Sequence, residues 1–178
     1  MKVELYNPTK HHHAIDTFFS EIDVENNVSI ESLAIEKRKD SALFLVLDNE
    51  KIAAMSYTHD FGEYRDGGWR VFTRTATHPA YRGKGFPRKR NLVSAAGLSA
   101  YTLPMQVAWA RDHGATSFWF TTNYNAGMAS SDRLGKFLDK IVDNDPRFSF
   151  SSIESVYYTT QRIWQLRYGD IINLQDPL

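Results

Sequence analysis

Residues 75–86 read TATHPAYRGKGF and join a strand-like pattern to a helix-like pattern through a glycine-rich basic loop. The glycines at positions 83 and 85 allow the backbone to turn tightly, so that several N–H groups can point toward one position. The helical pattern that follows directs the positive end of its dipole to the same position. Five cations lie within residues 82–90. A loop of this kind suits a phosphate or a pyrophosphate.

Two common nucleotide-binding motifs do not fit this loop. A Walker A motif needs a glycine, four residues and then Gly-Lys-Ser/Thr, and the dinucleotide fingerprint needs three spaced glycines near the first strand. Residues 82–87, RGKGFP, satisfy neither pattern. The plain alternative is a solvated basic loop that binds no ligand.

Composition restricts the class of protein. The chain has 178 residues, which is the usual size of one domain, so we expect a single domain over residues 1–178. It contains no cysteine, which excludes disulfides, thiolate zinc sites and thiol nucleophiles. Its 21 Lys and Arg residues equal its 21 Asp and Glu residues, which argues against a nucleic-acid-binding protein. It has neither the run of about 18–20 apolar residues that spans a membrane nor a secretory signal, so we expect a cytoplasmic protein without membrane contact.

The elements around the loop follow from periodicity. Strands are expected over residues 2–5, 42–47, 52–58, 69–77, 117–122, 148–160 and 162–168. Helices are expected after Thr9 and Ser29 as caps, over residues 88–113 with a break or kink at Pro104 and a stop at Gly114, and around Leu134–Ile141. This order predicts a mixed α/β (α+β) domain in which helices cover a sheet.

The loop resembles a family signature. The GNAT superfamily of acyl-CoA-dependent N-acetyltransferases carries Arg/Gln-x-x-Gly-x-Gly/Ala a few residues after a Val-x-Pro. Here Arg82–Pro87 follows Thr77-His78-Pro79 in the same way, and AWARDHGA at 108–115 with Asn123–Ala126 forms a second similar stretch. The resemblance in element order covers about residues 2–168. It implies a mixed, mostly antiparallel seven-stranded sheet with helices on both faces, and transfer of an acetyl group from acetyl-CoA to a primary amine of a small molecule or protein.

The resemblance also implies which residues hold the coenzyme. The backbone of the strand end would pair with the pantetheine arm, the loop amides and cations would receive the pyrophosphate, and one amide side chain would lie near the thioester. The implied set is Thr75, Ala76, Thr77, Arg82, Gly83, Lys84, Gly85, Phe86, Arg88 and Asn123. No metal is implied. The two strands beside the thioester are expected to separate.

The sequence departs from the family pattern in three places. Pro87 stands at the last motif position and has no N–H to offer a phosphate. Residues 127–133 lack the tyrosine that many members use to protonate the leaving thiolate, which leaves Tyr124 as the candidate acid. Extra length over residues 87–113 has no assigned role. For the base that takes the proton from the amine, His78 and Glu63 are the chosen candidates, and His59 and Asp60 also lie on strands or turns near the expected cleft.

Other interpretations stay open. The chain can be a catalytically inactive acyl-CoA-binding or protein-interaction module, or a nucleic-acid-binding domain that uses residues 82–90. Aromatic residues on the last strands leave a homodimer open. His11, His12 and His13 are adjacent and point in different directions along a helix, so we expect exposed residues and not a metal site. The aromatic residues 118–120 are expected in the core.

Overall fold

The protein is represented by a computed structural model that describes residues 1–22, 41–60, 69–71, 75–82, 101–123, 129–156 and 159–167. In chain order its elements are β1 (Lys2–Leu5), α1 (Pro8–Glu21), β2 (Ser41–Asp48), β3 (Lys51–Asp60), β4 (Trp69–Val71), β5 (Ala76–Thr77), the 3-10 turn η3 (Pro79–Tyr81), α3 (Leu103–Asp112), β6 (Ser117–Asn123), α4 (Ala129–Asn144), β7 (Phe148–Val156) and β8 (Thr159–Arg167). No helix within these ranges is both long enough and apolar enough to cross a membrane.

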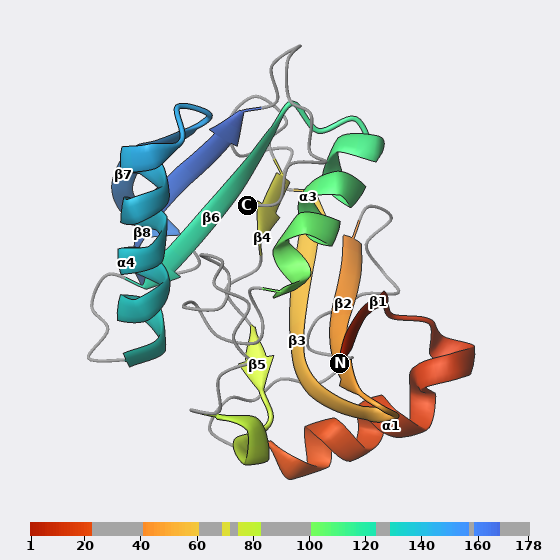
Figure 1. The fold of residues 1–178 in the computed structure, drawn as a ribbon. Helices are drawn as coiled ribbons and strands as arrows, with labels where there is room; N and C mark the ends of the chain where they lie inside the picture. Colours follow the sequence, from red (N-terminus) through yellow and green to blue (C-terminus); the bar gives the residue numbers. More distant parts are fainter. Residues whose placement is uncertain are drawn as a thin grey trace.

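The strands form one mixed sheet in the order β1-β2-β3-β4-β6-β8-β7, and β5 pairs with β3 (Figure 1). Every pairing is antiparallel except that of β4 with β6, which is parallel. The predicted hairpin of residues 42–58 is confirmed, and Asn49 in its turn has a φ of 56°. The mixed, mostly antiparallel class is therefore confirmed.

The predicted count of seven strands was wrong, because the described residues form eight. The single strand expected over residues 69–77 is two strands, β4 and β5, and both pair with β3. Between the pairs Thr58–Val71 and Met55–Ala76 there are two residues on β3 and four on the opposite segment. The register of pairing with β3 therefore differs by two residues between β4 and β5.

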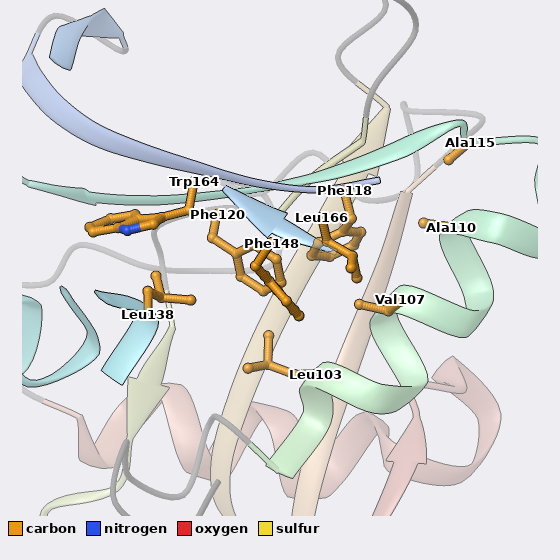
Figure 2. Packing of buried hydrophobic residues seen from close by; sticks show 10 residues of the cluster. All are labelled: Leu103, Val107, Ala110, Ala115, Phe118, Phe120, Leu138, Phe148, Trp164 and Leu166. Carbon is orange, nitrogen blue, oxygen red and sulfur yellow. The ribbon is translucent and has the colours of Figure 1, made fainter. Parts of the chain in front are cut away.

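Helices cover both faces of the sheet, as predicted. On one face, Ile15 and Phe18 of α1 pack against Leu43, Leu45 and Tyr57. On the other face, α3 and α4 pack against β6, β7 and β8, and their apolar side chains meet in one cluster (Figure 2). Within that cluster Phe118 and Phe120 are buried, which confirms that these aromatic residues are core.

Two helix ends differ in part from the sequence-based expectation. The cap of α1 is Asn7 and not Thr9, because the Asn7 side chain accepts hydrogen bonds from the N–H groups of Thr9 (2.9 Å) and Lys10 (3.2 Å). Pro104 lies in the first turn of α3, where its missing N–H costs no intrahelical bond. Residues 88–100, where an earlier helix was predicted, lie outside the described residues. Gly114 ends α3 with a φ of +90°, as predicted.

The prediction of three exposed histidines was wrong for His11, which is only 4% exposed. Its Nδ1 accepts the N–H of Asn7 at 2.9 Å, and its Nε2–H donates to Glu4 Oε2 at 3.1 Å. The cause is tertiary, because β1 places Glu4 over the first turn of α1. His12 and His13 are exposed, as expected.

Glu4 makes a pH-dependent contribution to stability. Hydrogen bonds from Lys10, then Lys2 and His11, lower the pKa of its carboxyl from 4.5 to about 2. Because the native pKa lies below the unfolded one, the contribution is full above pH 4.5 and is lost as the pH falls toward about 2. We expect Glu4→Gln to lower the melting temperature near neutral pH and to approach the wild type as the pH falls below about 2. A melting-temperature difference that does not change with pH would contradict this assignment.

Candidate functional site

The sheet separates where β4 ends. Among the described residues, β4 pairs with β6 at two positions, Trp69–Phe118 and Arg70–Trp119. Strand β6 continues to Asn123 and pairs with β8 along its whole length, whereas the pairing that the described part of the chain gives β5 is with β3. Within the described residues, β6 therefore has no strand on its β4 side beyond Trp119. In Figure 1 β6 runs at an angle to β3, and its arrowhead beside α4 lies apart from β5. Strand edges that the sheet does not use can pair with an extended ligand.

The predicted coenzyme residues that the structure describes lie on or next to these two separating strands. Ala76 and Thr77 form β5, directly after Thr75, and Asn123 is the last residue of β6. Arg82 follows the η3 turn. Gly83, Lys84, Gly85, Phe86 and Arg88, together with the catalytic candidates Tyr124 and Glu63, lie outside the described residues.

His78 holds the turn between β5 and the loop. Its backbone N–H donates to Ala53 O at 2.9 Å, and its Nδ1 accepts the N–H of Ala80 at 3.1 Å, which caps η3. Its Nε2 is 2.5 Å from Glu21 Oε2 at the end of α1. The ring also lies near those of Phe18 and Tyr81. Both ring nitrogens are thus engaged, and the described geometry gives this catalytic candidate a structural task.

Tyr81 and Arg82 fix the start of the loop. The Tyr81 hydroxyl donates to Asp48 Oδ2 at 2.9 Å, which ties η3 to the end of β2. Burial, followed by the hydrogen bond to Asp48, raises the pKa of this hydroxyl above its usual range. Arg82 Nε donates to Thr77 O at 3.0 Å, so the guanidinium lies beside the open end of β5. The residues that enter the glycine loop are therefore held from α1, β2 and β5.

Sequence reasoning identified His78 and Arg82 but missed Glu21, Asp48 and Tyr81. Their contacts join positions 57 and 33 residues apart, and no local pattern indicates such pairs. As for metals, the described ranges hold no group of three or more His, Asp or Glu side chains that could ligate an ion.

Comparison by sequence gives no assignment, since no family model and no curated protein matches the chain. Comparison of structures identifies the fold. The ribosomal-protein-S18-alanine N-acetyltransferase from Escherichia coli superimposes with a TM-score of 0.53 at 15% identity, over 96% of this chain and 97% of that one. The ribosomal-protein-S5-alanine acetyltransferase from Vibrio fischeri gives a TM-score of 0.57 at 11% identity, over 94% and 93%.

A third similar structure contains the coenzyme. It is a candidate streptothricin acetyltransferase from Bacillus anthracis in complex with acetyl-CoA, with a TM-score of 0.51 at 10% identity, over 83% of this chain and 72% of that one. Another, from Desulfovibrio desulfuricans, carries the GNAT name, with a TM-score of 0.56 at 12% identity, over 93% and 98%. At these identities the likeness concerns the fold. The chain has the fold of the GNAT-family acetyltransferases.

Proposed function

We propose that this protein is an N-acetyltransferase that moves the acetyl group of acetyl-CoA to a primary amine. The observation that carries the proposal is the separation of β5 from β6 immediately before a glycine-rich basic loop. In support, similar folds belong to proteins that acetylate alanine on ribosomal proteins S18 and S5, and one such fold was solved with acetyl-CoA.

The coenzyme would bind as an extra strand at the separation. Its pantetheine arm would pair with the backbone of Thr75–Thr77, and Asn123 would approach it from the end of β6. The amides of residues 83–86 would bind the pyrophosphate, with Arg82, Lys84 and Arg88 supplying positive charge. The anchored turn at His78 and Tyr81 supports this arrangement, because it fixes the direction in which the chain enters the loop.

The chemistry is a direct attack. The amine nitrogen bonds to the thioester carbon, the carbonyl oxygen takes up negative charge, and the C–S bond then breaks to release the CoA thiolate. A backbone N–H near Thr77 would stabilise the oxygen. Tyr124 would protonate the thiolate, and Glu63 or His78 would take the proton from the amine. His78 would first have to release Ala80 or Glu21.

The acceptor stays open to either a small molecule or a protein amine. We further propose that residues 1–178 act as one domain, since β1 and β8, near the two ends of the described chain, belong to the same sheet. We propose the cytoplasm as the place where the protein acts.

A transfer assay tests the proposal. The protein would be mixed with acetyl-CoA and a panel of small amines and peptides, with release of CoA thiol and acetylated product both measured. Acetylation of at least one amine is expected. Tight coenzyme binding without transfer across the panel would favour a binding module, and absence of binding would remove the assignment altogether.

Tyr81→Phe is expected to weaken acetyl-CoA binding about fivefold without unfolding the protein. The variant loses one hydrogen bond, worth about 1 kcal/mol, that fixes the start of the loop. Calorimetric titration would measure the change. Asp48→Ala and the double variant complete a mutant cycle, in which the double variant should be no weaker than either single variant. Additive losses, or unchanged affinity, would show that this contact does not position the loop.

A further inference from the structure

The β6–β8 half of the sheet has two unlike faces. Phe118, Phe120, Trp164 and Leu166 point into the cluster between the strands and helices α3 and α4 (Figure 2). By strand alternation the other face carries residues of a different character. Four polar side chains on it are each at most 6% exposed, namely Ser117, Thr121, Gln161 and Gln165. Trp119 and Ile163 are buried among them on the same face, so these polar groups need hydrogen-bond partners.

Thr121 is the residue of this face whose hydroxyl makes no hydrogen bond within the described part of the chain. Its Oγ1 is buried and has no hydrogen-bond partner among the residues that the structure describes. Ser117, on the same strand and face, accepts the indole N–H of Trp119 at 3.0 Å. Buried polar groups normally find a partner in the protein or in a ligand, and an unused one is costly in the free protein.

The place of Thr121 in the sheet indicates the ligand. It lies two residues beyond Trp119, the last residue of β6 that pairs with β4. It therefore sits where the strands begin to separate, on the β6 side of the gap in which the proposed function places the coenzyme. The pairings His59–Arg70 and Arg70–Trp119 place this face of β6 on the same side of the sheet as His59. This side is opposite to α3 and α4.

We propose that the Thr121 hydroxyl donates a hydrogen bond to the thioester carbonyl oxygen of bound acetyl-CoA. This inference rests on the proposed function. The hydroxyl of β6 then adds a donor to the backbone N–H that the proposed function places on the opposite strand. As the amine attacks and the C–N bond forms, the carbonyl electrons move onto oxygen and both donors bind it more strongly. When the C–S bond breaks, the oxygen returns to a carbonyl and Thr121 keeps its proton.

This role predicts opposite effects on the free and the bound protein. Thr121→Val keeps the side-chain shape and removes the unused hydroxyl, so the free protein should melt at the same or a higher temperature. The same variant should bind acetyl-CoA about fivefold more weakly, and CoA without an acetyl group as well as the wild type does. Where an amine acceptor is available, the turnover number should fall about 100-fold.

Infrared spectroscopy gives the direct readout. Acetyl-CoA labelled with ¹³C at the carbonyl would be bound to the wild type and to three variants. A hydrogen bond lowers the C=O stretching frequency, so Thr121→Val should raise it relative to wild type and Thr121→Ser should restore it. Ile163→Val is the packing control, because Ile163 pairs with Thr121 across β6 and β8. This control should leave the frequency unchanged.

The outcomes separate the two proposals. If wild-type protein binds acetyl-CoA but Thr121→Val changes neither the carbonyl frequency nor the preference for acetyl-CoA over CoA, the Thr121 role is wrong and the transferase proposal stands. A frequency change in Ile163→Val as large as that in Thr121→Val would also overturn the role. If wild-type protein binds neither acetyl-CoA nor CoA, both proposals fail.

Discussion

Replacing Arg82 by alanine and Gly85 by valine in the same chain is expected to lower acetyl-CoA affinity at least about 100-fold. Arg82 supplies charge next to the open end of β5, where its Nε holds Thr77 O. Hydrogen bonds to charged groups are worth about 1.5–3 kcal/mol each, so losing two of them accounts for the expected change. Valine at position 85 also restricts the backbone of a turn that glycine allows. Calorimetric titration with acetyl-CoA would measure the effect.

The control for this prediction is Arg111→Ala. Arg111 is an exposed arginine on α3 that pairs with its neighbour Asp112, so its removal changes the net charge equally without touching the loop. The Arg111→Ala variant should bind acetyl-CoA as the wild type does. Arg82→Lys keeps the positive charge but loses the planar set of guanidinium N–H donors. Its affinity for acetyl-CoA should therefore lie between those of the wild type and the double variant. A folded double variant with wild-type affinity would refute the role of the loop.

Trp164→Ala is expected to reduce the free energy of unfolding by about 3–5 kcal/mol. Trp164 is completely buried in the cluster formed by α3, α4 and the β6–β8 half of the sheet. Its indole N–H donates to Asp139 Oδ1 at 3.2 Å, and the Arg162 guanidinium lies 4.8 Å from its ring. The variant would leave a large cavity and remove these contacts. Since single domains are stable by about 5–15 kcal/mol, this is a large share of the total.

Phe150→Ala is the matched control for Trp164→Ala. Phe150 contacts the same indole, with ring centroids 5.9 Å apart, but it is 45% exposed. Its removal should lower the free energy of unfolding by about 1 kcal/mol or less, because this exposed ring buries little apolar surface when the protein folds. Urea unfolding of both variants would measure the difference, provided that the free energy of unfolding falls with urea concentration at the same slope in each. Equal losses in the two variants would contradict the placement of the core around Trp164.

Much of the fold could be predicted from local patterns, because the elements concerned carry their signals within a few residues. The apolar run of residues 42–47, its turn and the following run of residues 52–58 predict the β2–β3 hairpin. The spacing of Ile15 and Phe18 predicts the buried face of α1. The interruption between β4 and β5 could not be predicted, because residues 69–77 read as one strand and the register shift exists only relative to β3.

The candidate site divides in the same way. The glycine-basic loop and the strand end before it are contiguous, so the sequence shows them directly. The contacts of His78 with Glu21 and of Tyr81 with Asp48 depend on how α1 and β2 pack, and no spacing in the chain encodes them. The burial of His11 depends likewise on Glu4 of β1. Thr121 looks like any threonine on a strand until its burial and its unused hydroxyl are known.

A crystal structure of the protein with acetyl-CoA bound tests the central claim most directly. We expect the diphosphate to accept hydrogen bonds from the amides of residues 83–86, and the pantetheine arm to run between Thr77 of β5 and the end of β6. The acetyl group should then lie at the level of Thr121. A coenzyme bound elsewhere, or a loop whose amides point away from the diphosphate, would contradict the account.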